Sequence, residues 1–382
     1  MGPTRRRWIG WVAWLGAVAS WWFVPWVVCG HHAKAYYRGE VDTQECLART
    51  VANDVNAAAR LQIYRSGNAR FDGQSAIAFY QMAALGLGQF VLEHPEKKSE
   101  YLPTIERAVE RLVDPRTHPY AAQVYGRHGT TSLGAGGHAY MGYVNLGLGI
   151  LRRIDPETKY AELHDRLTGD LARQIGRAPN GLIETYPGET WPPDVAAVAG
   201  SIGLHGAATG HDWEPLLGPW AQRFANCALG EGGYLIQRMR TGSCSRLDAP
   251  RGSGTAIAAY FLSFADPGLS LCLWESLRDT GYRSLLGFGG IREYVPGQWG
   301  MGDGNSGPVV VGLSAGASGF GLGAARAHGD RASYVGIYRT GALVSVPVIT
   351  AGQTRFVLGG ALGNALLLAM LTALPPNASD PK

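Results

Sequence analysis

Six apolar segments rich in glycine and alanine recur along the chain and constrain its fold more than any other feature. They begin about every 50 to 63 residues, at 73–93, 136–152, 194–209, 253–265, 307–326 and 356–373. A helix that is apolar on all sides is buried, whereas a helix with one apolar stripe covers a core. The six segments therefore predict the inner helices of one repeated architecture.

Charged, amphipathic segments alternate with the apolar ones, at 43–65, 98–113, 157–177, 212–227 and 267–279. Six inner helices with about six outer ones around them predict an all-α fold, an (α/α)6 toroid. The 54 glycines, in a chain of 382 residues, suit helices that pack closely around a shared centre. Segment 281–300 breaks the helical rhythm and predicts a long loop that can include a short hairpin.

The N-terminal segment combines three arginines, Arg5 to Arg7, with an uncharged stretch from Trp8 to Val28. A helix rising about 1.5 Å per residue crosses a hydrocarbon core of about 30 Å over this length, and its tryptophans suit the two interfaces. Because arginines stay on the cytoplasmic side, we expect an uncleaved signal anchor over 1–30 in a bacterial-type inner membrane. A cleaved signal peptide and a twin-arginine signal are the alternatives, but "VPWVVCGHH" lacks a small-x-small cleavage pattern.

The rest of the chain predicts one periplasmic or extracellular domain, 31–376, and a short polar tail, 377–382. Segment 356–373 is also long enough to cross a bilayer. It occupies the sixth inner position and carries Asn364 in its middle. We therefore expect it to be a core helix and not a second membrane span.

The cysteines Cys29, Cys46, Cys227, Cys244 and Cys272 show neither a CxxC motif nor the spacing of a zinc site. An extracytoplasmic location permits a disulfide. Cys227 and Cys244 flank a short loop and are the best-placed pair, while buried free thiols remain an equally open interpretation.

Charge and motifs exclude several classes of function. The net charge is +4, and without Arg5 to Arg7 the chain holds 31 basic against 30 acidic residues, so no basic stripe for nucleic acid is present. The sequence has no GxSxG elbow, Walker loop, HExxH or Rossmann fingerprint, and "GDGNSGP" lacks the spacing of an EF-hand. We expect no cofactor, no metal and no nucleic-acid partner.

Acids, a histidine, arginines and aromatics stand at the N-terminal ends of the predicted inner helices, which line one rim of a toroid. Carboxylates and histidine suit proton transfer, and aromatic rings suit stacking of a sugar or a terpene skeleton. The candidate catalytic residues are Asp72, His138, Glu189, Asp194 and Asp303. The candidate substrate-binding residues are Tyr140, Tyr186, Trp191, Arg251, Trp299, Asn305 and Arg355.

Each candidate also has a purely structural interpretation. Asp72, Asp194 and Asp303 stand where helix N-caps stand, and a capping aspartate stabilises a helix by about 1 kcal/mol. His138 follows small residues and can be a satisfied core histidine, and the aromatic side chains can simply pack. The convergence of several acids on one rim favours a site.

Two stretches, "GHAYMGYVNLGLGILRRIDPETKYAELHDRLTGDLARQI" and "GLIETYPGETWPPDVAAVAGSIGLHGAATG", resemble the linalool dehydratase/isomerase family, an (α/α)6 barrel. The resemblance covers residues 136–210 and places His138 and Glu189 on matching positions. Gly188 stands where the family has its first cysteine, and Pro193, followed by Asp194, stands near its second. Without these sulfurs the rim is more similar to that of an (α/α)6 glycoside hydrolase or polysaccharide lyase.

Three hypotheses of function follow. The leading one is a membrane-anchored enzyme that acts on an envelope or environmental glycan by acid/base chemistry, as a hydrolase or lyase. The second is a hydro-lyase or isomerase of the linalool dehydratase/isomerase kind on a small apolar alcohol. The third is a non-catalytic envelope binding protein. Asn305 supports it, because a carboxylate at this position would complete an acidic pair with Asp303, and asparagine does not supply one.

Overall fold

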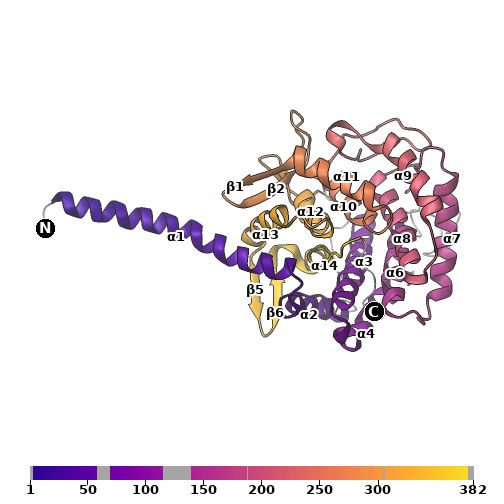
Figure 1. Cartoon of the computed structure of the whole chain (residues 1–382), viewed down its shortest axis with the longest axis horizontal. Coiled ribbons are helices and arrows are strands. Elements are labelled where there is room, and N and C mark those ends of the chain that lie inside the picture. Colours follow the sequence, from indigo (N-terminus) through magenta and orange to yellow (C-terminus); the bar gives the residue numbers. More distant parts are fainter. Residues whose placement is uncertain (1–2, 58–68, 115–138, 187, 304–305, 377–382) are drawn as a thin grey trace.

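The computed structural model describes residues 3–57, 69–114, 139–186, 188–303 and 306–376, and the fold is mostly helical, at 68 %. Figure 1 shows a rounded body of helices from which the N-terminal helix α1 projects. The polar tail predicted at 377–382 lies outside the described residues.

The six apolar segments form helices that pack in a closed circuit. Each helix contacts the next one along the chain, and the last contacts the first. These inner helices are α3 (Ala69–Glu93), α6 (Ala139–Ile154), α8 (Pro192–Thr209), α10 (Gly252–Leu262), α12 (Ala315–Ala327) and α14 (Gly360–Leu371). Asn364 is buried in α14, where its side chain bonds the backbone of Phe356 and Gly360, so this segment is a core helix as expected.

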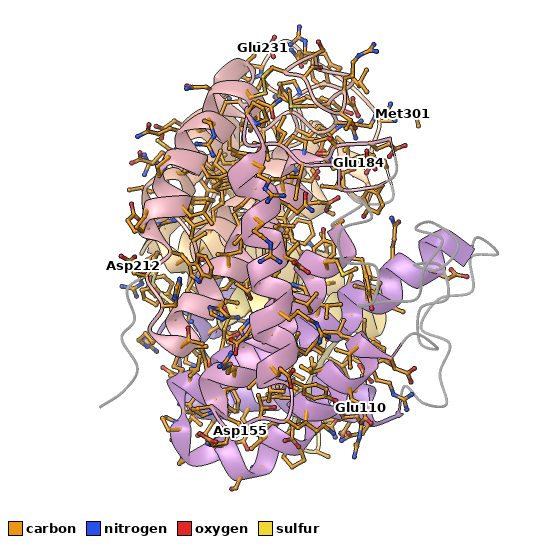
Figure 2. All side chains as sticks on the ribbon, turned by 90° about the vertical axis from the view of Figure 1, so that its right-hand side faces the viewer. Glu110, Asp155, Glu184, Asp212, Glu231 and Met301 are labelled. Carbon is orange, nitrogen blue, oxygen red and sulfur yellow. A yellow bond between two sulfur atoms is a disulfide. The ribbon has the colours of Figure 1, made fainter. Side chains whose placement is uncertain are left out.

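A second set of helices surrounds the circuit. It comprises α2 (Val41–Ala57), α4 (Lys98–Val113), α7 (Ala161–Arg177), α9 (Glu214–Ala228), α11 (Pro267–Ser276) and α13 (Arg331–Ser345). Five of them pack on inner helices, and α9 packs on α7. The sequence analysis identified five of these six segments and missed α13. In Figure 2, Glu110, Glu184 and Met301, which precede inner helices, lie towards one side of the body, and Asp155 and Asp212, which follow them, lie towards the other.

The expectation of an all-α fold is too narrow, because short strands interrupt the helices. The strands β1 (Tyr282–Leu285), β2 (Phe288–Arg292), β3 (Val309–Val310) and β4 (Leu313–Ser314) form an antiparallel sheet in the order β1-β2-β4-β3, and β5 (Pro347–Thr350) pairs with β6 (Gln353–Phe356). Each hairpin turns on a residue pair with positive φ: Leu286–Gly287, Val311–Gly312 and Ala351–Gly352. These pairs have the geometry of type I′ turns, in which glycine accepts the second position without strain. The fifth and sixth inner helices consequently begin later than predicted.

Short helical turns complete the described secondary structure. They are the 3-10 helices η1 (Pro95–Lys97), η3 (Glu231–Gly233) and η5 (Val357–Gly359), and the π-helical turn η4 (Leu277–Gly281).

Glycine lets the inner helices approach one another at two adjacent turns of α8. A Cβ atom on Gly200 would lie 2.4 Å from the carbonyl oxygen of Phe261, and one on Gly203 would lie 1.9 Å from that of Phe264. Both contacts are to backbone atoms, which cannot rotate away. The contact between α8 and α10 therefore requires glycine at these positions.

Helix α1 (Pro3–Tyr37) runs without a break across residue 30, where the sequence analysis placed a domain boundary. Its C-terminal end joins the body, because Tyr36 is buried and its ring packs at a tilt against that of Tyr338 on α13. Its N-terminal part carries exposed tryptophans, among them Trp8 and Trp21. By length and composition, one helix among the described residues could cross a membrane, Asp72–Glu93 within α3, and 83 % of its apolar window is buried inside the protein.

Cys227, at the end of α9, forms a disulfide with Cys244, which was the pair favoured from the sequence. The bond closes the connection between α9 and α10, residues 229–251. Isolated β-bridges order this connection further, pairing Thr190 with Met239 and Ile236 with Pro250. Cys29, Cys46 and Cys272 are free thiols.

Candidate functional site

Asp194 is the most deeply buried of the predicted site carboxylates that the structure describes. Pro192 and Pro193 begin α8 after the N-cap residue Trp191, which places Asp194 at the third helical position. Its side chain is 9 % exposed and accepts a hydrogen bond from the hydroxyl of Tyr143 on α6. Asp194 is therefore not the N-cap of α8, which was the alternative to a role in a site. Its carboxyl is turned towards the neighbouring inner helix, α6.

Burial controls the protonation of Asp194. It raises the pKa of this carboxyl from its ordinary value of 3.8 to about 6, against the opposing effect of hydrogen bonds from Tyr143 and Tyr186. The ionised form is disfavoured because little water solvates it. A carboxyl with a pKa near neutrality can both give and take a proton at physiological pH.

Glu189 and Trp191 form the polar side of the same site. Tyr186 and Glu189 pair through their backbones, and Gly188, just before Glu189, has a φ of 77°. The carboxylate of Glu189 accepts a hydrogen bond of 2.8 Å from the indole of Trp191 and lies 3.9 Å from the guanidinium of Arg238. The same guanidinium lies 5.8 Å from the centroid of the Trp191 ring.

The connection 229–251 joins this group to the start of α10. A Cβ atom on Gly254 would lie 2.9 Å from the ring of Pro193 and 2.3 Å from the side-chain oxygen of Gln237. That oxygen is buried and has no hydrogen-bond partner. The first turns of α8 and α10 and the disulfide-closed connection thus meet at Pro193, the residue before Asp194.

Arg251 and Asp303 form a second polar group at the start of α10. The guanidinium of Arg251 pairs with Asp303 at 2.6 Å and with Asp248 at 2.9 Å, and it lies 5.6 Å from the centroid of the Tyr294 ring. Asp303 also accepts a hydrogen bond from the backbone of Ser306. Because α12 begins at Ala315 with Ser314 as its N-cap, Asp303 is not a helix cap either.

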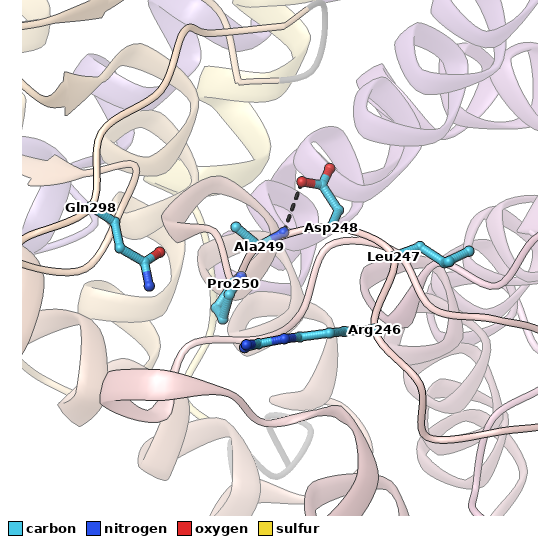
Figure 3. Close-up of a pocket in the computed structure, with 6 residues that line it drawn as sticks. All are labelled: Arg246, Leu247, Asp248, Ala249, Pro250 and Gln298. Carbon is cyan, nitrogen blue, oxygen red and sulfur yellow. Dashed lines mark hydrogen bonds between the residues drawn. The ribbon is translucent and has the colours of Figure 1, made fainter.

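Two open cavities are lined by partners of Arg251, the first by Asp248 and the second by Tyr294. The first has a volume of about 460 Å³ and is lined by Arg246, Leu247, Asp248, Ala249, Pro250 and Gln298 (Figure 3). The second, of about 220 Å³, is bounded by Arg292, Gln298 and Trp299 together with Val309 and Val311. Trp299 is 74 % exposed, and the guanidinium of Arg292 lies 5.2 Å from the centroid of its ring. A flat, accessible aromatic ring beside an arginine suits a polar ring-shaped ligand.

Glu293 is a buried carboxylate within segment 281–300 that was not among the candidate residues chosen from the sequence. It is fully buried and accepts a hydrogen bond of 2.7 Å from the Ser253 hydroxyl and one of 3.2 Å from the Ser253 amide. Burial raises its pKa against the effect of these bonds. Because it bonds a free amide in the first turn of α10, it acts as a helix cap supplied from outside the helix. Ile291 and Val295, two residues before and after Glu293, are buried as well. This spacing of two, typical of an extended segment, is the sequence signal that could have placed Glu293 on the inner side.

The structure does not bring every predicted residue to this site. Tyr140 is buried and donates its hydroxyl to the carbonyl of Leu112 at the end of α4, so it faces the outer layer. Arg355 of β6 makes two hydrogen bonds to Asp54 of α2, at 2.7 and 3.1 Å. Asp72 lies in the first turn of α3, where an acid meets the positive end of the helix dipole.

His138 and Asn305 lie outside the described residues. Sequence reasoning missed Tyr143 and Arg238 as site residues. Tyr140 and Tyr143 are one turn apart on α6, and spacing alone did not reveal which of the two faces Asp194. Among the described residues, no group of three or more His, Cys, Asp or Glu side chains is placed to hold a metal ion.

The burial of Asp194 predicts a pH-dependent effect on stability. The folded protein holds the proton of this carboxyl more tightly than the unfolded chain, so its contribution to stability is largest at low pH and falls as the pH rises from about 4 to about 6. From the two pKa values the change is about 3 kcal/mol. Asn does not titrate, so the unfolding free energy of Asp194→Asn relative to the wild type should rise by about this amount between pH 4 and pH 7.

Chemical denaturation at several pH values measures this difference. Asp212→Asn, at an exposed position far from the site, serves as the control and should show a constant difference. A constant difference for Asp194→Asn as well would mean that water reaches its carboxyl freely.

Comparison with known proteins adds no assignment: no protein-family model matches the chain, and no curated protein shows significant similarity to it.

Proposed function

We propose that this protein is a membrane-anchored (α/α)6 enzyme that cleaves a glycan by general acid/base catalysis outside the cytoplasm. The toroid is supported by the closed circuit of inner helices with outer helices around it. The single observation that carries the proposed activity is Asp194, a buried carboxyl with a pKa of about 6 in the first turn of an inner helix. A second carboxylate, Glu189, lies five residues before it in the chain and bonds the indole of Trp191.

Asp194 and Glu189 have different surroundings, and this difference suggests their roles. Asp194 is buried among Tyr143, Tyr186 and the first turn of α8, and its raised pKa of about 6 keeps part of it protonated near pH 6, where it can donate that proton to a leaving oxygen. Glu189 is about one-third exposed and lies near the positive charge of Arg238, surroundings that suit a carboxylate. It would accept a proton from water in hydrolysis, or from a sugar carbon in elimination.

The surroundings favour a glycan over a small apolar alcohol. Trp191 and Trp299 offer ring faces near arginines, and Trp299 is largely exposed. The two cavities lined by partners of Arg251 are open and lined in part by charged side chains. A terpene alcohol would require a closed, apolar pocket, because a small ligand gains affinity mainly from apolar surface buried on all sides.

Helix α1 is the proposed membrane anchor. Its uncharged stretch is long enough to cross a bilayer, it projects from the body, and its exposed tryptophans suit the interfaces. The arginines Arg5 to Arg7 would then stay in the cytoplasm and the body would lie outside it.

The activity is tested with the full-length chain in detergent. The protein is incubated in water enriched in oxygen-18 with a panel of bacterial envelope glycans and with terpene alcohols, and products are read by mass spectrometry. Fragments carrying the heavy oxygen would identify a hydrolase, and unsaturated fragments without it a lyase. Loss or gain of water on an alcohol, with no change in any glycan, would contradict the proposal in favour of a hydro-lyase.

If a folded protein changes neither panel, the acid/base proposal is wrong for these substrates, and binding of the same glycans is then measured by calorimetry. Tight binding without turnover would identify a non-catalytic binding protein.

A further inference from the structure

Exposed aliphatic side chains gather on one side of the body. In the described part of the chain, residues 285–286, 343–349 and 357–358 carry leucines, valines and an isoleucine that are 41 % to 72 % exposed. We call these three segments the apolar collar. Single exposed apolar residues are normal on a protein surface, but clusters of them mark contact with a partner or a membrane.

The collar surrounds the point at which α1 leaves the body. A Cβ atom on Gly287, in the turn between β1 and β2, would lie 2.5 Å from the indole nitrogen of Trp26 of α1, and the guanidinium of Arg339 on α13 lies 4.2 Å from the Trp26 ring centroid. Helix α13 ends next to this contact and leads directly into β5. The amide of Val357 bonds the carbonyl of Val346, which joins the third segment to the second. Figure 1 shows β1, β2, α13 and β5 on the side from which α1 projects.

At two positions of the collar, the backbone conformation disfavours the bulky apolar residue that is present. Leu286 has a φ of 52° and Val346 a φ of 47°. Gly, Asn and Asp are favoured in this conformation, and a bulky or β-branched residue is strained there. Both side chains are more than half exposed, so they gain no burial within the chain to offset the strain. An apolar surface outside the chain would supply that burial.

We infer that the apolar collar rests in the headgroup and acyl boundary of the bilayer that α1 is proposed to cross. This inference depends on the proposed membrane anchor but not on the proposed activity. The lipid surface is the occupant that the geometry favours, because the exposed residues Val27 and Val28 of α1 directly follow Trp26, which lies against the turn between β1 and β2 in the collar. Arg283, exposed on β1 beside the collar, is placed to meet lipid phosphates.

Depth-dependent quenching tests the inference on the full-length chain. The free thiols Cys29, Cys46 and Cys272 are replaced by alanine, and one new cysteine is labelled with an environment-sensitive fluorophore. The labelled variants are Ile349→Cys in the collar, Trp14→Cys in α1 and Asp212→Cys across the body. Each is reconstituted into phosphatidylcholine/phosphatidylglycerol vesicles with or without brominated acyl chains.

We expect brominated lipid to quench the probes at 349 and 14 several-fold more than the probe at 212. Quenching at position 14 alone would contradict the membrane contact of the collar but not the membrane insertion of α1. Quenching at neither position would contradict both. A blue-shifted probe at 349 that brominated lipid does not quench would show that a second copy of the chain covers the collar, which also overturns the inference.

A turn variant separates the collar from effects on folding. Leu286→Asn places a favoured residue at the positive φ, so the melting temperature should not fall, while quenching of the probe at 349 should decrease. The matched control is Val311→Asn, which changes the equivalent position of the turn between β3 and β4, at the opposite end of the same sheet. It should leave quenching at 349 unchanged, and an equal decrease in both variants would contradict the inference.

Discussion

Replacing Asp194 by Asn is expected to lower kcat on the glycan substrate by about 10²- to 10⁴-fold, the range typical for removal of a general acid or base. Asn keeps the volume of Asp and can still accept the hydrogen bond from Tyr143, but it cannot donate a carboxyl proton to a leaving oxygen. KM should change much less than kcat, because the lost interaction belongs to the transition state.

The pH profile identifies the role of Asp194 more directly. As a general acid it must be protonated, so kcat/KM of the wild type should fall as the pH rises above about 6. Tyr143→Phe removes a hydrogen bond that lowers the pKa of Asp194, so the fall should move to higher pH. A profile that is the same in Tyr143→Phe and in the wild type would assign this titration to another group. Full activity of Asp194→Asn would remove Asp194 from the mechanism.

Gly203→Ala is expected to destabilise the protein by about 3 kcal/mol or more, at the upper end of the range for overpacked cores. The new Cβ atom would lie 1.9 Å from the carbonyl oxygen of Phe264 and 2.7 Å from the Cα of Ala265, so α8 and its neighbour must move apart. The same movement would disturb the first turns of α8 and α10, on which the site is built. Denaturant unfolding followed by circular dichroism measures the loss.

The matched control is Gly319→Ala in the middle of α12. No atom outside its own helix lies within 4 Å of the Cβ position there, so alanine fits without a clash. Because alanine favours the helix over glycine, this variant should be as stable as the wild type or up to about 1 kcal/mol more stable. Equal effects of the two substitutions would contradict the close approach of α8 to α10.

The alternation of inner and outer helices could be read from the sequence because burial leaves a local record. A helix apolar on all sides, such as the one ending at Glu93, differs in composition from an amphipathic one wherever it lies in space. The core position of Asn364 followed from the same kind of local evidence, and the structure confirms it. Cys227 and Cys244 were the best-placed pair in the sequence, with free thiols an equally open interpretation, and the structure joins them in a disulfide. The short hairpin expected within 281–300 is present as β1 and β2. The turns at Val311–Gly312 and Ala351–Gly352 were not predicted, because they lack the Asn-Gly or Asp-Gly signal of a type I′ turn.

The sequence by itself thus determined which segments of this protein are buried, since each helix carries its own pattern of apolar residues. Only the tertiary structure decided which side chains share one site. Tyr140 faces Leu112 and Tyr143 faces Asp194, although the two tyrosines stand only about one turn apart on α6. Arg355, which was predicted to bind substrate, instead pairs with Asp54 of α2. The physical reason is that a site consists of distances between residues remote in the chain, and these distances depend on how the helices are rotated and packed against one another.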